Sequence, residues 1–387
     1  MLIKDKVKCK VPFGTMSVPK KSVKLIDHML ANKMLTNGKV VETFEEAFAK
    51  KFNRKHAVAV SSGTDAVTIA LAALQDFGLT RGDKVLIPAL TFVATANAVI
   101  NAGFQPKFVD VDRHTLNMDP WKLEEAIDEG CRAIVVVHLM GNPANMIKIY
   151  NIAKKYDLLL IEDCAEAHGA RYGVSHVGSW GLMSCYSLYA AHIVSSVEGG
   201  MITTNEPECV RVAKSLRNHG LELKGSNWTF NRIGYSAKMN ELEAAVGLYN
   251  LEEFDNTLSI RRRNFSFLND VFKNLKWDKY FITLDVEGAN QVGPHAFSMI
   301  VKDEAPFTKE DFVSYLSKKG IDNRNLFYCI PTQCEPYKKY CSNTYAESEF
   351  CSNNGTHIGI HQDLSINQLQ YVIKKISEYI SYHERLS

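Results

Sequence analysis

The chain lacks the features that mark a membrane protein, a secreted protein or a nucleic-acid-binding protein. No apolar run approaches the roughly 18 residues that span a bilayer. Residues 1–6, Met-Leu-Ile-Lys-Asp-Lys, include three charged residues and no apolar signal-peptide segment. A net charge of +2 gives no electrostatic reason to expect nucleic acid or an acidic surface as a partner. We therefore expect a cytoplasmic protein that binds neither membrane nor nucleic acid.

The nine cysteines include no C-x-x-C pair. Their odd number, their wide scatter and the lack of a secretion signal favour reduced thiols. A late group could in principle hold a metal or an iron–sulfur cluster, but its spacing matches no ligand pattern. Its members are Cys329, Cys334, Cys341 and Cys351. We expect no metal.

What the chain does contain is an alternation of strands and helices. With 387 residues, 46% of them hydrophobic, it is long enough for two domains and a sizeable core. Continuous apolar strands separated by helices predict a mostly parallel sheet covered on both faces. The expected strands are 57–60, 84–88, 106–111, 133–138, 158–162 and 200–204, and expected helices include 65–74, 94–102, 121–128 and 147–156.

The character of the sequence changes near residue 254. A long helix through 260–264 is expected to lead out of the first domain, and its three arginines are predicted to form a solvated helix face rather than a phosphate clamp. A strand at 297–301 and helices near 309–319 and 369–382 follow. We therefore expect an α/β domain over 1–253 and a smaller α+β domain over 254–387.

Two strand ends carry residues suited to binding a ligand. At 61–65 the sequence Ser-Ser-Gly-Thr-Asp joins a strand to a helix, where glycine allows close approach and helix amides face an anion. The segment 161–166, Ile-Glu-Asp-Cys-Ala-Glu, ends another strand, and a carboxylate there could pair with a protonated pyridine nitrogen. Simple helix caps explain both motifs too. Phe92 follows the strand 84–88, and could equally stack on a flat ring or pack in the core.

Together these segments resemble the DegT/DnrJ/EryC1/StrS family of fold-type I pyridoxal phosphate enzymes, which act on nucleotide-linked sugars. The resemblance covers nearly the whole chain and rests on residues 35–38, 61–66, 88–97, 161–163 and 233–245. It implies a large mixed, mostly parallel sheet in a cofactor-binding domain and a smaller α+β C-terminal domain. It also implies a homodimer with shared active sites.

The resemblance assigns residues to the cofactor phosphate. The backbone of Gly63 and Thr64 and the hydroxyl of Ser187 would hold it. Ser236 stands where the family commonly has an asparagine that reaches the phosphate of the neighbouring subunit. That departure puts the contact between subunits in doubt.

Three further residues would hold the cofactor ring. By resemblance, Phe92 would stack on it and Asp163 would pair with its nitrogen. Glu166 matches the position, often glutamine, that bonds the ring hydroxyl.

The residue missing from this pattern is a lysine. In the segment 187–200, His192 occupies the position of the lysine that forms the Schiff base with pyridoxal phosphate in the family. Imidazole cannot form that bond, but its ordinary pKa of about 6.5 lets it move protons near neutral pH. A purely structural histidine, in a chain that binds cofactor poorly, is the alternative.

Histidine at this position is also found in the 3-dehydratases of the family, which act in deoxysugar biosynthesis. Residues 138–143, His-Leu-Met-Gly-Asn-Pro, resemble those enzymes, as residues 360–362 do more weakly. The segment 221–232 contains no cysteine, which favours the branch without an iron–sulfur cluster.

The resemblance thus predicts a lyase that uses pyridoxamine 5'-phosphate to remove the C3 hydroxyl of a nucleotide-linked 4-keto-6-deoxy sugar. His192 would act as base and acid, and L-glutamate would restore the cofactor from pyridoxal 5'-phosphate. Another reaction on a keto sugar and a non-catalytic homologue that binds a nucleotide sugar remain as alternatives.

Overall fold

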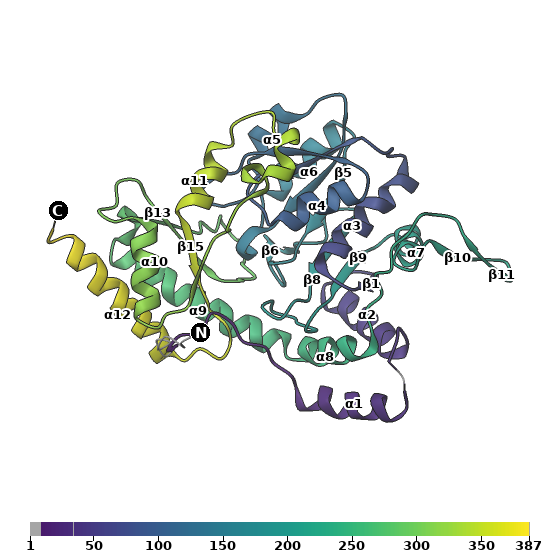
Figure 1. Cartoon of the computed structure of the whole chain (residues 1–387), viewed down its shortest axis with the longest axis horizontal. Helices are drawn as coiled ribbons and strands as arrows, with labels where there is room; N and C mark the ends of the chain where they lie inside the picture. The colour runs from purple at the N-terminus through teal and green to yellow at the C-terminus, as the bar shows by residue number, and fades with distance from the viewer. Residues whose placement is uncertain (1–8, 34, 387) are drawn as a thin grey trace, which may run out of the picture.

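The computed structural model describes residues 9–33 and 35–386, so residues 1–6 lie outside the described range. Its larger part is built on a seven-stranded sheet of order β1-β9-β8-β5-β4-β2-β3 (Figure 1). The strands are β1 (His56–Val60), β2 (Lys84–Pro88), β3 (Gln105–Val109), β4 (Cys131–Val137), β5 (Leu159–Asp163), β8 (Met183–Ser187) and β9 (Gly200–Thr204). Within this sheet β9 alone runs against its neighbours, so the sheet is mixed and mostly parallel, which confirms the prediction.

Helices cover both faces of this sheet because successive strand residues point to opposite sides. In β2, Val85 and Ile87 pack in one core with residues of α3 and α4, whereas Leu86 packs in another with residues of α5 and α6. The helices of this part are α1 (Lys20–Ala31), α2 (Lys39–Lys51), α3 (Gly63–Ala73), α4 (Val93–Asn101), α5 (Pro120–Ala126), α6 (Met146–Lys155), α7 (Pro207–Leu216) and α8 (Glu241–Glu252).

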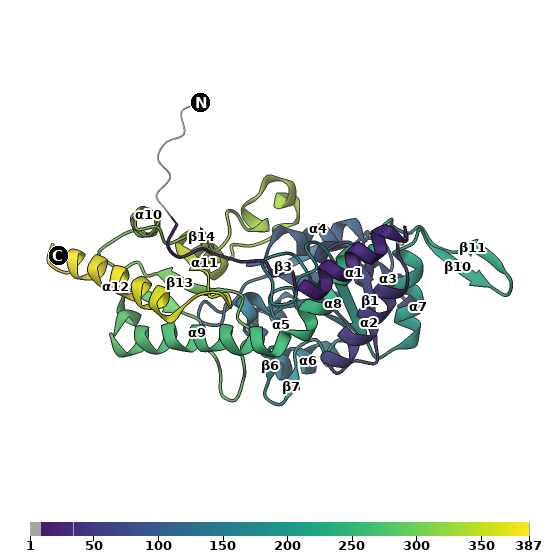
Figure 2. The same cartoon turned by 90° about the horizontal axis from the view of Figure 1, so that it is seen from below.

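The smaller part has an antiparallel sheet of order β12-β13-β15-β14. Its strands are β12 (Phe281–Thr283), β13 (Phe297–Val301), β14 (Asn323–Asn325) and β15 (Gly355–Ile358). Its helices are α9 (Phe254–Asn274), α10 (Lys309–Lys318), α11 (Ala346–Asn354) and α12 (Ile366–His383). The long helix α9 runs from the larger part into this one and lies beside α12 in both views (Figures 1 and 2). Val11 pairs with Ile321 of this part, and the division at residue 253 stays a prediction.

Two hairpins stand outside both sheets: β6 (Arg171–Tyr172) with β7 (Ser175–His176), and β10 (Leu221–Lys224) with β11 (Asn227–Phe230). Figure 2 shows the β10–β11 hairpin projecting from the end of the larger part. Short 3-10 helices occupy Leu74–Phe77, Leu139–Gly141, Trp277–Lys279, Pro331–Gln333 and Glu335–Tyr340. None of the described helices is both long and apolar enough to cross a bilayer.

Several sequence predictions agree with the structure and three do not. The strands expected at 84–88, 200–204 and 297–301 have those bounds. The strand β8 was not predicted, because its serines hide the apolar pattern; the buried Ser184 hydroxyl instead donates to the Gly178 carbonyl at 2.7 Å.

The other two errors concern charge and sulfur. The predicted solvated arginine face is wrong for Arg261, which is buried, because α9 is covered by the segments that join the two parts. The expectation of reduced thiols is wrong for Cys329 and Cys334, which form a disulfide because the turn between them brings them together. The other seven cysteines are free.

Candidate active site

The first turn of α3 lies directly against the end of β8. A Cβ atom on Gly63 would come within 2.6 Å of the Ser187 Cβ, so only glycine allows this approach. The Ser62 hydroxyl caps the helix by accepting from the Asp65 amide at 3.0 Å. The amides of Gly63 and Thr64 precede the amide used by the cap and have no partner within the helix, so they and the Ser187 hydroxyl can face one anion.

Asp163 and Phe92 are linked through the first turn of α4. The Thr95 hydroxyl donates to the Asp163 carboxylate at 3.1 Å, and the Thr95 amide donates to the Phe92 carbonyl at 3.2 Å. Burial raises the pKa of Asp163, which a cationic partner would lower again. The Phe92 ring is 62% exposed, so it does not pack in the core.

Glu166 lies three residues beyond Asp163 on the loop after β5. Its carboxylate accepts from the Met140 amide at 2.8 Å. Burial raises the pKa of Glu166 to about 7, with the charge of Asp163 adding to the rise and the Met140 amide opposing it. Near neutral pH this carboxyl group can therefore carry a proton and act as a donor.

His192 lies between two other histidines. Its ring centre is 5.1 Å from that of His295, which precedes β13, and 5.7 Å from that of His168, which follows β5. Burial, and then His295 and Arg261, hold the pKa of His192 well below its usual range. Its Nδ1 atom is buried and has no hydrogen-bond partner in the described part of the chain. The imidazole is thus neutral at pH 7 and able to accept a proton.

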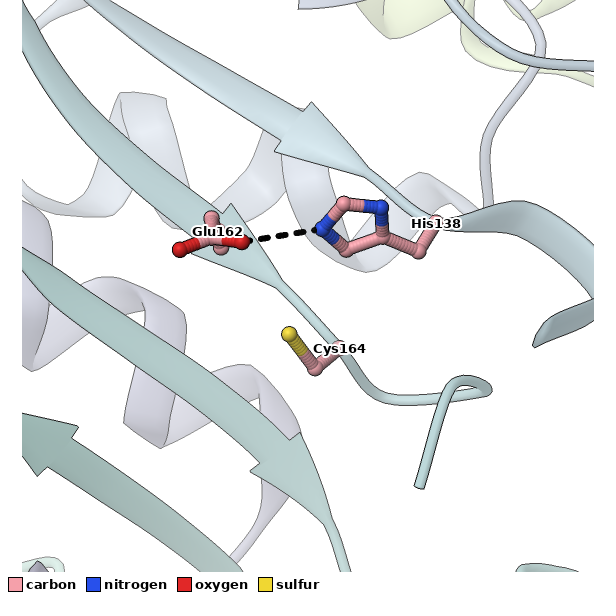
Figure 3. Close-up of side chains that lie close together, drawn as sticks. All are labelled: His138, Glu162 and Cys164. Carbon is pink, nitrogen blue, oxygen red and sulfur yellow. Dashed lines mark hydrogen bonds and ion pairs between the residues drawn. The ribbon is translucent and has the colours of Figure 1, made fainter. Parts of the chain in front are cut away.

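A buried pair supports the loops behind this site (Figure 3). His138 Nε2 lies 3.2 Å from Glu162 Oε2, and both side chains are fully buried. The Ala144 amide donates to His138 Nδ1 at 3.1 Å, which fixes the ring proton on Nε2. The His138 amide donates to the Asp163 carbonyl at 3.1 Å, so the pair holds the ends of β4 and β5 together.

The same pair lies near Cys164, and their ligand atoms fall within 4.8 Å of one another, as a metal site would require (Figure 3). The Glu162 carboxylate, however, also accepts three backbone amides at 2.7 Å each. These donors belong to Gly178, Trp180 and Gly181. With its oxygens and both His138 nitrogens already bonded, the trio forms a structural anchor, and we assign no metal to it.

The structure brings several of the predicted site residues together. Gly63 meets Ser187, and Asp163 is linked to Phe92 through Thr95. Ser236 is exposed, but the carbonyl of the next residue, Ala237, accepts from the Ser61 amide at 3.0 Å, so Ser236 borders the segment 61–65.

Sequence reasoning missed four residues of the site. Thr95 lies within the recognised segment 88–97, and His168 lies two positions beyond Glu166, so proximity to these motifs was the available signal. His295 and Arg261 come from elsewhere in the chain and had no local signal.

Comparison with known proteins places the chain in a family. The model of the DegT/DnrJ/EryC1/StrS aminotransferase family matches residues 17–377. A GDP-4-keto-6-deoxy-D-mannose 3-dehydratase of Escherichia coli O55:H7 is 31% identical over 373 residues, covering 90% of this chain and 95% of the relative. A GDP-perosamine synthase of Caulobacter vibrioides is 32% identical over 348 residues, covering 89% and 91%.

A solved structure agrees over a similar length. The E. coli GDP-4-keto-6-deoxy-D-mannose-3-dehydratase with bound hydrated PLP superposes with a TM-score of 0.89 at 28% identity, covering 95% of this chain and 100% of the other. The predicted fold type and a pyridoxal phosphate-dependent family are thereby confirmed. The chain belongs to the DegT/DnrJ/EryC1/StrS aminotransferase family.

Proposed function

We propose that this protein is a lyase that removes the C3 hydroxyl of a nucleotide-linked 4-keto-6-deoxy sugar, with pyridoxamine 5'-phosphate as cofactor and L-glutamate as the amino donor that regenerates it. The observation that carries the proposal is His192, a neutral histidine in place of the family's lysine, at a site that keeps Gly63, Thr64, Asp163 and Ser187 around it. Identity alone does not separate this activity from transamination, since relatives at 31% and 32% identity carry both names.

The residues present fit the cofactor. Gly63, Thr64 and Ser187 would hold its phosphate, since the glycine is required for helix and strand to approach. Phe92 offers an exposed ring on which the pyridine can stack. The buried Asp163 would gain a cationic partner in the ring nitrogen, which would favour its charged form.

Glu166 completes the ring contacts. With a pKa of about 7 it can donate a proton to the ring oxygen and still accept from the Met140 amide. The bond from the Met140 amide would hold the Glu166 carboxyl group in position for this contact.

Pyridoxamine phosphate, when bound, supplies an amine that condenses with the C4 ketone and a ring that withdraws electrons. With the cofactor bound, His192 would accept a proton, because its neutral imidazole has a free lone pair. The protonated imidazole can return that proton to the departing C3 oxygen, so that the hydroxyl leaves as water. Without an amine at position 192, the chain does not compete with the sugar for the cofactor.

The function is tested with GDP-, CDP-, UDP- and dTDP-linked 4-keto-6-deoxy sugars, pyridoxamine phosphate and glutamate. We expect one sugar to yield a 3-deoxy-4-keto product, one ammonia per turnover and solvent deuterium at C3. A 4-amino sugar formed without ammonia would instead identify an aminotransferase. Failure to bind pyridoxamine phosphate, followed by absorbance, would identify a non-catalytic homologue.

We also propose that two copies of the chain form the working unit. The β10–β11 hairpin exposes Trp228 and Phe230, at 67% and 69%, and a second copy would cover them. Ser236 lies shortly after this hairpin and is open to the same partner. Replacing both aromatic residues by aspartate is expected to give monomers in sedimentation equilibrium. Trp121→Asp, at a position 69% exposed on α5, is the matched control and should leave the dimer intact.

A further inference from the structure

Arg261 is a buried cation without a buried anion. Its side chain, on α9, is 2% exposed, and burying an unpaired charge is costly. The guanidinium donates to three uncharged acceptors; burial lowers its pKa to about 10, and the charge of the exposed Asp363 opposes that shift. Because burying this charge lowers the stability of the fold, we expect the arginine to serve another purpose, through its charge or through the directions of its hydrogen bonds.

The three acceptors come from three separate segments that meet around His192. Nη2 donates to the carbonyl of Ala191, which directly precedes His192, at 3.4 Å. Nη1 donates to the carbonyl of His295 at 3.4 Å, and Nε donates to Gln362 Oε1 at 3.3 Å. One rigid guanidinium fork thus holds the backbones of both histidines whose rings lie 5.1 Å apart.

The next residue on the helix provides an internal comparison. Arg262 also donates to two carbonyls, those of Val292 and Gly169, each at 2.8 Å. It therefore joins the two parts of the protein in the same way, and with shorter bonds. It does not bond the residue before His192. If Arg261 only joined the two parts, replacing either arginine should have the same effect, whereas an effect on His192 should be seen only when Arg261 is replaced.

The surroundings of the His192 ring lower its pKa. His168 and His295 face its ring from the loops after β5 and before β13, and Tyr189 faces it from its own loop. Burial, His295 and Arg261 lower the pKa of His192, in that order of size. The same guanidinium lowers the pKa of His295 and of His168.

We propose that Arg261 is a positioning residue that keeps the His192 imidazole in place and in its proton-accepting form. The effect of Arg261 on the imidazole follows from the geometry of this chain, whereas its effect on catalysis rests on the proposed dehydration.

The first test is the titration of His192, followed by NMR of histidine-labelled protein without substrate and assigned with His192→Asn. Arg261→Gln removes the charge, so we expect the pKa of His192 to rise by about one pH unit. Arg261→Lys keeps the charge but not the fork, and should leave that pKa nearly unchanged. Arg262→Gln is the matched control and should not move it.

The second readout is the pH profile of dehydration. A base must be unprotonated, so activity rises with pH through the pKa of His192. Arg261→Gln should move this rise to higher pH, so that kcat falls about tenfold at pH values below the pKa of His192 in both proteins, with little change in KM. Arg261→Lys should lower kcat at every pH without moving the rise, because the loop that carries His192 is less well held.

A second variant keeps the test decisive if Arg261→Gln does not fold. Gln362→Glu places a carboxylate beside the Arg261 Nε and neutralises its field without removing it, so the pKa of His192 should again rise. An unchanged pKa in both variants, or an equal rise in Arg262→Gln, would overturn the proposal. A rise in a protein that performs no dehydration would overturn the proposed function alone, since this titration needs no turnover.

Discussion

Replacing His192 by lysine is expected to abolish the proposed dehydration and to let the protein bind its cofactor covalently. Dehydration should fall by about a thousandfold, because proton transfer by a positioned side chain contributes roughly 10²- to 10⁴-fold. The new amine, in a pocket that already lowers the pKa of His192 by burial, would be able to attack the aldehyde of pyridoxal phosphate. Product analysis measures the first effect, and mass spectrometry after borohydride reduction measures the second.

The control for this variant is a lysine introduced elsewhere in the same loop. Glu198→Lys adds the amine at an exposed position and should neither trap cofactor nor slow dehydration. Unchanged dehydration by His192→Lys would show that another group moves the proton, and His295 would then be the next candidate because of its contact with the same ring.

Removing the buried carboxylate of Glu162 is expected to cause the largest loss of stability. In Glu162→Ala the three amides and the His138 Nε2–H lose their acceptor in the core, which should lower the free energy of unfolding by about 3–5 kcal/mol. Urea denaturation at pH 7 measures this change. Gly178 and Trp180 lie in the loop that leads into β8, and Glu162 holds this loop against β5. Cofactor binding should therefore weaken too, because the ends of β5 and β8 carry cofactor-binding residues.

An exposed glutamate provides the comparison. Glu252 pairs with Lys21 at 2.6 Å, but the two side chains are 47% and 67% exposed, so Glu252→Ala should cost less than about 1 kcal/mol. If Zn²⁺ stabilised the wild type and not Glu162→Ala, the trio with Cys164 would be a metal site, and the assignment as a structural anchor would be wrong.

The candidate site could be predicted from sequence only where its residues lie in short motifs. The segment 61–65, Asp163 and His192 each stand in a local pattern that the family resemblance made readable. The structure was needed to choose between the alternatives at two of these motifs. At 61–65 the helix cap made by Ser62 leaves the first amides of α3 free for an anion, so both interpretations hold. The ring of Phe92 is exposed, which excludes core packing.

Arg261 shows why the remaining residues of the site could not be predicted from the sequence. A run of three arginines on a predicted helix is most often solvated, because burying a charge is costly. Its burial depends on acceptors 34, 70 and 101 positions away in the chain, at His295, Ala191 and Gln362. No periodicity within one helix reports on segments so distant.

By itself, then, the sequence determined the mostly parallel sheet and the missing lysine, since apolar runs, glycine at a strand end and residue identity are local properties. Only the tertiary structure decided the place of β8 between β9 and β5, the number of hydrogen bonds that Glu162 accepts and the state of His192. These depend on which remote groups surround a side chain once water is excluded, and pKa and hydrogen bonding are set by those neighbours.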